Sequence, residues 1–541
     1  MSLKDRVKFL EERLKGWMEI GIALSTEPDS NKLFEMILEE AKHISNADGR
    51  TLYMKADSGD QLNFEILLND SMNSAMGGTS GVEVTLPPVE LFNEKGEPNH
   101  SNVAAYVANT GKTVNIKDAY KEEGFDFSGT KKFDEMTGYR SKSFLTVPLK
   151  NHEDEIIGVM QLLNAIDLTT KEVIPFSNEV QQQIESLASQ GAVALTNKRL
   201  VEELRNLFES FIKLIATAID KKSPYTGGHC ERVPEIAMML SDAVHNTKTG
   251  KYKDYALTEE QRYELYIAAW LHDCGKVATP PHVVDKGTKL ETIYDRIENV
   301  NTRFEVAKRD LEIEYLKEKL KNIKDDKNLN SNHEDSFKKK LDELKEEQDF
   351  INKTNVGGEF MSKDDQKKVT DISNKYVYVE NGKPGPFLSE NEVNNLQIPK
   401  GTLLPEERQI INDHITITID MLEKLPYPKH LRNVPEFAGG HHETLDGKGY
   451  PKGLKDEDMS VQAKIMAIAD IYEALTAADR PYKDGKKLSQ AMRIMGFMRD
   501  DYHIDKDLFE IFVKENIYKQ YANKHLGKDQ LDSVNEKEVL S

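Results

Sequence analysis

The chain has 541 residues and a formal net charge of −20 at neutral pH. Its length is enough for two to four domains of ordinary size, and a hydrophobic content of 38% allows ordinary cores. The acidic balance argues against a nucleic-acid partner, because such a partner needs a concentrated basic face.

Three further features concern the compartment. The sequence has no run of about 18 apolar residues, which predicts no membrane span. The N-terminal stretch MSLKDRVKFLEERLK lacks the apolar core of a secretory signal. Cys230 and Cys274 are the two cysteines and cannot form a disulfide framework. We therefore expect a cytoplasmic protein with no membrane contact.

The N-terminal part of the chain has the mixed pattern of an α+β domain. Apolar residues at helical spacing predict a helix over 3–24. Residues 62–68 alternate between apolar and other side chains, which predicts a strand. Residues 144–150 and 155–165 are rich in β-formers and flank a short polar turn, so we expect them to form a hairpin.

This part of the chain, up to residue 198, resembles a GAF domain. The matching stretches are NTGKTVNI (109–116), SFLTVPL (143–149) and GVMQLLNA (158–165). The resemblance implies a sensory domain that binds a small-molecule effector, or alternatively a module that only dimerises. Cyclic-nucleotide-binding members often carry Lys after the Asn of the last strand. Here Ala165 follows Asn164, which counts against that class of ligand.

Residues 178–220 have a helical pattern almost throughout. Apolar residues recur at short helical steps from Ile184 to Ile215, and such a stripe needs a partner. We interpret this segment as a signalling helix that pairs in a parallel homodimer. The alternative is that the stripe packs against its own N-terminal domain.

A mainly helical domain is predicted over 205–515. It is interrupted at 287–402 by a highly charged segment. Within the interruption, residues 303–324 and 335–352 are expected to form two antiparallel helices with solvated faces. Residues 516–541 are expected to be a C-terminal tail.

Three clusters in the helical domain have the character of a metal site. His272-Asp273 follows an apolar helical run, and His441-His442 open the segment HHETLDGKGYP. Asp470 stands in the apolar stretch AIADIYEAL, where an unpaired buried carboxylate would cost several kcal/mol. A bound cation removes that cost. Many histidines with few carboxylates suit Fe, Mn or Zn better than Mg or Ca.

The order of these clusters resembles the HD-GYP family of HD-superfamily phosphohydrolases. The matching elements are His229, HDCGK (272–276), His414, HHETLDGKGYP (441–451) and ADIYEALTAADRPYK (469–483). The resemblance implies an all-α catalytic domain that hydrolyses cyclic di-GMP to pGpG and/or GMP. The expected chain is therefore multidomain, with an α+β GAF domain, a signalling helix and an all-α HD domain that carries a charged helical insertion.

The resemblance also implies roles for individual residues. Two divalent transition metals are implied, with Fe or Mn favoured. Their ligands would be His229, His272, Asp273 and Asp470 for one metal, and Asp273, His414, His441 and His442 for the other. The catalytic residues would be Asp273 and Lys276, and the substrate would be bound by Lys276, Tyr450, Arg480 and Lys483. Members that bind a third metal carry Glu where this chain has Tyr225, so we expect two metals.

Two alternatives stay open at this point. The protein could be a catalytically weak receptor that binds a cyclic dinucleotide and signals through protein contacts. The complete ligand set argues against this reading. The enzyme could also act on another cyclic dinucleotide, such as cyclic GMP-AMP, and the sequence does not separate that substrate from cyclic di-GMP.

Overall fold

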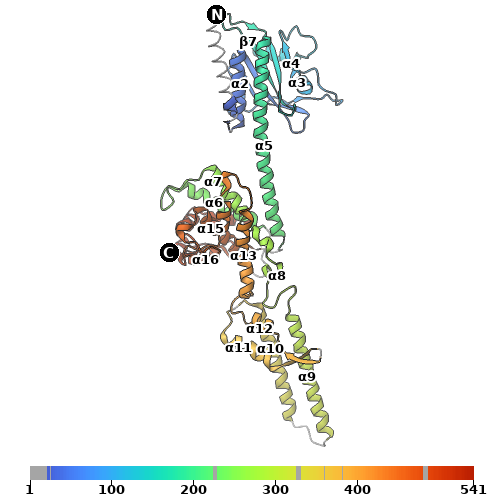
Figure 1. Ribbon diagram of the computed structural model, residues 1–541, viewed down its shortest axis with the longest axis vertical. Coiled ribbons are helices and arrows are strands. Elements are labelled where there is room, and N and C mark those ends of the chain that lie inside the picture. Colours follow the sequence, from blue (N-terminus) through green and yellow to red (C-terminus); the bar gives the residue numbers. More distant parts are fainter. Residues whose placement is uncertain are drawn as a thin grey trace. The chain divides into compact units, whose positions relative to one another are not determined.

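The computed structural model describes residues 21–541, with gaps at 25, 28, 223–227, 325–330, 359, 381 and 479–484. The helix expected over 3–24 lies almost wholly outside the described residues. The chain divides into two compact units, Met1–Leu207 and Phe208–Ser541 (Figure 1). Within the described part of the chain, no helix has both the length and the apolarity that crossing a membrane requires.

The first unit is built on one antiparallel sheet. Its main strand order is β3-β2-β1-β7-β6-β5, with β4 paired to β2 and β8 paired to β7. The expected hairpin is confirmed, because β6 and β7 pair with Val147 opposite Met160. The strands are β1 Ala47–Lys55, β2 Gln61–Asn69, β3 Ser74–Gly77, β4 Val89–Glu90, β5 Val114–Ile116, β6 Phe144–Lys150, β7 Ile156–Ile166 and β8 Val173–Ile174.

Helices pack against both faces of this sheet. α2 (Ser30–Ser45) and α5 (Asn178–Lys222) share one core with the sheet, in which Ile37, Leu52 and Ile184 are fully buried. The short helix α3 (Val103–Thr110) shares a second core with the opposite face. A fourth helix, α4, spans Ser128–Thr137. This unit therefore has the expected α+β architecture.

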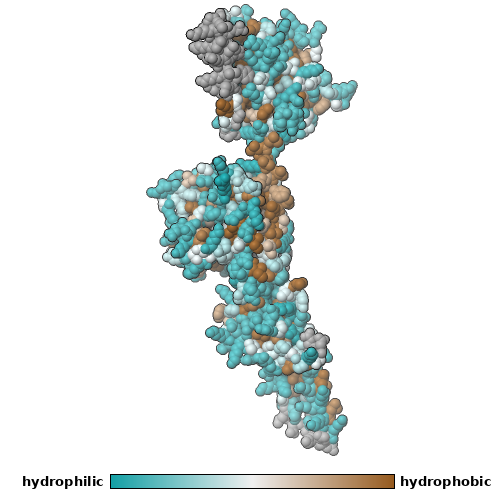
Figure 2. All heavy atoms as spheres, viewed as in Figure 1, coloured by the Kyte–Doolittle hydropathy of each residue, from teal (hydrophilic) through white to brown (hydrophobic). Residues whose placement is uncertain are grey.

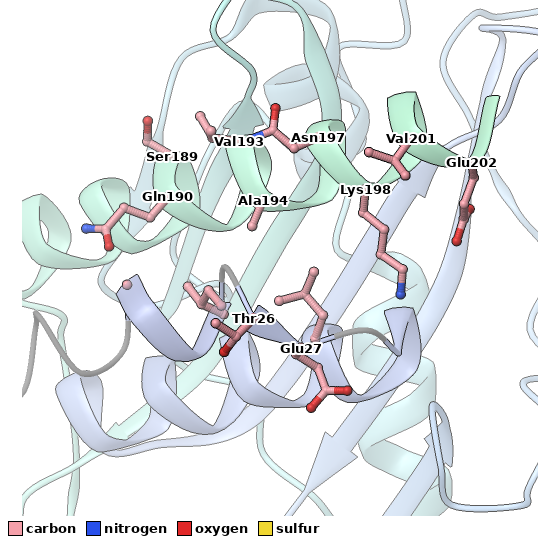
Figure 3. Close-up of a pocket in the computed structure, with 13 residues that line it drawn as sticks. Thr26, Glu27, Ser189, Gln190, Val193, Ala194, Asn197, Lys198, Val201 and Glu202 are labelled. Atoms are coloured by element: carbon pink, nitrogen blue, oxygen red, sulfur yellow. The ribbon is translucent and has the colours of Figure 1, made fainter. Parts of the chain in front are cut away.

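A groove of the first unit lies between α5 and the chain that leads into α2. Figure 3 shows Thr26 and Glu27 on one side and Ser189, Gln190 and Asn197 of α5 on the other. Its lining mixes apolar and polar side chains. None of the clusters of metal-ligating side chains found among the described residues lies in it.

The second unit is mainly helical and has one large core. The helix α7 begins with the expected capping box, in which Thr258 and Gln261 satisfy each other's backbone N–H groups. α15 is buried along most of its length, so it forms the centre of the unit. The elements are α6 His229–Asn246, α7 Glu259–Leu271, η1 Cys274–Ala278, α8 Pro281–Val284, α13 Pro405–Leu422, η2 Lys429–Leu431, α14 Val434–Gly439, η3 Asp456–Asp458, α15 Val461–Thr476, α16 Leu488–Asp500, α17 Lys506–Lys514, α18 Ile517–His525 and α19 Glu536–Leu540.

The expectation of a C-terminal tail after residue 515 is wrong. α18 and α19 belong to the core of the helical domain, where Tyr518, Tyr521 and Val539 are buried. The hydroxyl of Tyr472 donates a hydrogen bond of 2.6 Å to the carbonyl of Tyr518. Apolar residues are sparse in this stretch of sequence, and only the contacts with distant helices show that they are buried.

The interrupting segment forms the two expected helices, α9 (Ile297–Lys324) and α10 (Ser331–Val356). They pair along their length, and the rings of Tyr315 and Phe337 stack with centroids 4.4 Å apart. Their base is more than a pair of solvated helices, because it has a core of its own that contains Phe304, Ile351 and Phe387. The other elements of this segment are α11 Lys363–Lys375, β9 Val377–Glu380, β10 Lys383–Pro386 and α12 Glu390–Leu396.

Candidate metal centre

Three histidines of the second unit are oriented in the same way. The Nδ1 atoms of His272, His414 and His441 each donate to the backbone carbonyl three residues earlier in the chain, at 2.8 Å for His272 and 2.6 Å for His441. His272 directly follows α7, His414 lies within α13, and His441 lies just after α14. In each case the same helix supplies the carbonyl. The hydrogen bond fixes the ring and leaves Nε2 free to face inward, as metal-binding histidines require.

The first group of ligating side chains contains His229, His272 and Asp470. His229 is the first residue of α6, and its Nε2 lies 3.2 Å from Oδ1 of Asp470. The same atom lies 3.3 Å from Nε2 of His272 and 3.2 Å from Oδ2 of Asp273. Four side chains, from α6, α15 and the turn of residues 272–273, thus point at one position.

The second group contains His414, His441 and His442. The rings of His441 and His442 have centroids 4.3 Å apart, and those of His414 and His442 are 5.4 Å apart. Asp273 joins the two groups, because its Oδ1 lies 3.2 Å from Nε2 of His414 while its Oδ2 faces His229. The seven side chains predicted as ligands are therefore brought together, with one carboxylate between two groups.

Several inward-facing atoms of this cluster lack hydrogen bonds. Among the described residues, Oδ1 of Asp273, Nε2 of His414 and Nε2 of His441 are buried polar atoms with no hydrogen-bond partner. Buried polar atoms are normally satisfied, and leaving them unpaired is costly. A cation between them removes the cost. Imidazole nitrogens with carboxylate oxygens are a donor set that divalent transition metals accept, so the residues fit such ions.

The electrostatics favour the ligand forms of His441, His442 and Asp273. For His229, burial is outweighed by the neighbouring carboxylates, which raise its pKa well above the usual value. Burial lowers the pKa of His442 to about 4, and burial with the neighbouring histidines holds the pKa of His441 well below its usual value. Burial alone would raise the pKa of Asp273, but Lys276 and the surrounding histidines hold it well below the usual range. Neutral imidazoles and an ionised carboxylate are the forms that bind metal.

Lys276 and Tyr450, two of the predicted substrate-binding residues, border the cluster. Nζ of Lys276 lies 2.5 Å from Oδ2 of Asp273, and its side chain is 28% exposed. The ring of Tyr450 stacks on His442 with centroids 5.0 Å apart. The other two, Arg480 and Lys483, lie outside the described residues, and so does Tyr225, on which the expectation of two metals rests.

Sequence reasoning missed Glu473, which lies one turn after Asp470 on α15. Glu473 is fully buried and contacts Nδ1 of His229, while its Oε1 accepts a hydrogen bond of 2.7 Å from Nε of Arg232. Burial would raise its pKa, but His229 and Arg232 hold it at about 2. The available signal was the spacing, because residues three apart on a helix share a face.

Glu443 belongs to the segment HHETLDGKGYP, but the sequence predicted no role for it within the loop of residues 440–455. Its side chain is 1% exposed and accepts hydrogen bonds from the backbone N–H groups of Lys452 at 2.7 Å and Leu454 at 2.9 Å. Gly449 passes so close that an added Cβ would lie 2.4 Å from Cα of Glu443. The buried carboxylate therefore holds the loop closed beside His442.

Family comparisons agree with the two units. Residues 29–195 match the GAF domain family, and residues 390–508 match the HD domain family. The chain therefore has an N-terminal GAF domain and a C-terminal HD domain, which confirms the expected multidomain fold. The HD match begins after α9 and α10, so it includes His414 but not His272. The insertion separates these two ligands in sequence, and the fold brings them together.

Curated relatives match over short segments. A 3′3′-cGAMP-specific phosphodiesterase of Vibrio cholerae is 41% identical over 83 residues, which is 15% of this chain and 19% of the relative. A cyclic di-GMP phosphodiesterase of Thermotoga maritima is 41% identical over 93 residues, 17% of this chain and 25% of the relative. A cyclic di-GMP phosphodiesterase of Pseudomonas aeruginosa is 45% identical over 74 residues, which is 14% of this chain and 17% of the relative. The chain thus matches a quarter or less of the length of these relatives.

Proposed function

We propose that this protein is a metal-dependent phosphodiesterase that hydrolyses cyclic di-GMP to pGpG and/or GMP. The observation that carries the proposal is the buried cluster in which Asp273 joins two groups of histidines. The relatives named as cyclic di-GMP phosphodiesterases support the choice of substrate. A chain with a net charge of −20 repels long polynucleotides, whereas a few local cationic groups can hold a small dianion.

Two divalent ions, with Fe or Mn favoured, would be held by His229, His272, Asp273 and Asp470 and by Asp273, His414, His441 and His442. When bound, such a pair supplies Lewis acidity to a phosphate ester and to the attacking water. Lys276 stands at the edge of the cluster with its charge beside Asp273, where it can stabilise negative charge on a phosphoryl oxygen. Tyr450 offers a ring face next to His442. Arg480 and Lys483 remain predicted contacts to the substrate.

A second substrate is favoured by a specific observation. Two relatives from Vibrio cholerae are named as 3′3′-cGAMP-specific phosphodiesterases, one of them 36% identical over 116 residues. 3′3′-cyclic GMP-AMP has the same ring of two phosphodiesters and differs in one base. The metal ligands act on the phosphodiester, which both compounds share, so the cluster can support hydrolysis of either compound.

The test is hydrolysis of cyclic di-GMP and 3′3′-cyclic GMP-AMP by Mn²⁺- or Fe²⁺-loaded protein, with products separated by chromatography. Asp273→Ala removes the carboxylate common to both groups and should lower turnover by at least ~100-fold. Asp420→Ala, at an exposed position of α13, is the control and should behave like wild type. Near-normal turnover by Asp273→Ala would refute the metal mechanism. Tight binding of the dinucleotide by wild type without product would instead favour the receptor.

We further propose that the GAF domain regulates this activity, that two copies pair in parallel through α5, and that the protein acts in the cytoplasm. Exposed leucines along α5 support pairing. Cys230 and Cys274 are both free, in keeping with a reducing compartment. A small-molecule effector of the GAF domain remains a prediction of the sequence.

A further inference from the structure

The last part of α5 packs into the core of the second unit, Phe208–Ser541. Ile212, Ala216 and Ile219 are buried, and they recur at the spacing of one helix face. Ile212 and Ile219 belong to the large core of the helical domain. The helix that begins in the GAF domain therefore ends as a fixed part of the HD domain, and its final residues lie beside the metal centre.

Asp220 holds the start of α6. Its Oδ2 accepts hydrogen bonds of 3.2 Å from the backbone N–H groups of Gly228 and Cys230, on either side of the ligand His229. The α6 helix has no side-chain cap from its own N-cap residue, Gly228. A carboxylate from α5 thus does the work of an N-cap, where free N–H groups and the helix dipole favour a negative charge.

Lys222 holds the segment that follows Asp273, the carboxylate common to both groups of ligands. Its Nζ donates to the backbone carbonyls of Lys276 at 3.1 Å, Val277 at 2.5 Å and Thr279 at 2.7 Å. These carbonyls lie at the end of the short helix η1, whose first residue directly follows Asp273. A cation at the carbonyl end of a helix satisfies groups that otherwise lack partners.

The two contacts meet at one place. The last turn of α5, the start of α6 and the η1 segment together line a single small cavity, to which Asp220, His229 and Asp273 all contribute. His229 and Asp273 are 3.2 Å apart across it. Residues that orient metal ligands in this way commonly change metal affinity or activity by ~10–100-fold when they are lost.

We propose that Asp220 and Lys222 are positioning residues that tie the geometry of the metal centre to the last turn of α5. A shift or rotation of α5 then changes the spacing between His229 and Asp273, and with it the affinity of the centre for metal. Because α5 is continuous from the GAF domain, this pair gives the regulation proposed above a physical route to the site. In its consequence for turnover, the inference rests on the proposed phosphodiesterase function.

The experiment uses the full-length protein and Mn²⁺ as the probe. Lys222→Met keeps the aliphatic stem but removes the donors, and Asp220→Ala removes the acceptor. Lys222→Arg and Asp220→Asn keep a donor and an acceptor, respectively. Lys221→Met, at the exposed neighbouring position, is the matched control. Mn²⁺ affinity is measured by calorimetric titration, kcat and KM are measured with cyclic di-GMP, and circular dichroism checks the fold.

Lys222→Met and Asp220→Ala should weaken Mn²⁺ binding by ~10-fold or more and lower kcat, with KM within about twofold of wild type. Lys222→Arg and Asp220→Asn should recover most of the affinity, and Lys221→Met should match wild type. Wild-type Mn²⁺ affinity in both Lys222→Met and Asp220→Ala overturns the inference, and so does an equal loss in Lys221→Met. If the Mn²⁺ pattern appears but wild type does not hydrolyse the dinucleotide, the positioning role stands and the proposed function fails.

Discussion

Glu473 and Asp470 lie one turn apart on α15 and contact opposite nitrogens of His229. Nε2 faces Asp470 and the shared carboxylate, while Nδ1 faces Glu473. Arg232 in turn holds the other oxygen of Glu473 at 2.7 Å. A buried carboxylate behind a ligand histidine fixes the ring and raises its basicity, which strengthens metal binding.

We therefore expect Glu473→Gln, which keeps the shape but removes the charge, to weaken Mn²⁺ binding at the His229 group by ~10–100-fold. At micromolar Mn²⁺ the bound metal should fall from two ions toward one, measured by elemental analysis after gel filtration. Glu457→Gln, at an exposed position, is the control and should keep both ions. Full metal content in Glu473→Gln would show that the carboxylate has no part in holding His229.

The ligands could be predicted because their residue types and their order in the chain carry the pattern. Glu473 could not be predicted with the same ease, since a single Glu in a helix normally faces solvent. Its role depends on His229, which is 244 positions away in sequence. Asp220 and Lys222 share this difficulty, because they bind backbone groups. Every residue has a backbone, so the sequence does not show which residues they contact.

At the scale of elements, the centre depends on the close approach of η1 to α13. Gly275 N–H donates a hydrogen bond of 2.9 Å to Oγ1 of Thr418. A Cβ on Gly275 would lie 2.0 Å from the carbonyl oxygen of His414 and 2.6 Å from the nitrogen of Thr418. Both are backbone atoms of α13, so neither can move unless the helix moves.

Gly275→Ala should accordingly push η1 away from α13 and lengthen the 3.2 Å separation between Asp273 and His414. A displacement of about 1 Å can cost ~100-fold in turnover, and overpacking costs ~1–3 kcal/mol of stability. Steady-state kinetics and thermal melting measure the two effects. Gly358→Ala, where the added Cβ meets nothing within 4 Å, should leave both unchanged. Wild-type kcat in Gly275→Ala would mean that the contact does not set the ligand spacing.

Elements with strong periodicity were predictable, and those defined by tertiary contacts were not. The capping box at Thr258 and the hairpin formed by β6 and β7 have local causes that can be read along the sequence. The burial of Val539 and of Phe387 depends on helices far away in the chain. The C-terminal helices and the base of the insertion were therefore missed as packed structure.

At the scale of the whole molecule, α5 is the element common to both units. Along it, Leu200, Leu204, Leu207, Phe211 and Leu214 alternate steps of four and three, the spacing of a coiled-coil seam. These side chains are between 50% and 67% exposed. Figure 2 shows the hydrophobic surface that they give to α5. The first part of the predicted stripe, Ile184, Ala188, Ala192 and Leu195, does pack in the core of the GAF domain, as the alternative predicts. That packing does not cover the side chains from Leu200 onward.

A second copy of α5 would bury this seam, and each large apolar side chain buried contributes ~1.5–3 kcal/mol. We expect wild type to sediment as a dimer of twice 61.5 kDa at micromolar concentration. Leu204→Glu combined with Phe211→Glu keeps good helix formers but places charges in the seam, and should give a monomer. Glu202→Lys changes a charge on the opposite side of the helix and should leave the dimer intact. Analytical ultracentrifugation of the three proteins decides the matter, since a monomeric wild type or a dimeric double variant would exclude pairing through this seam.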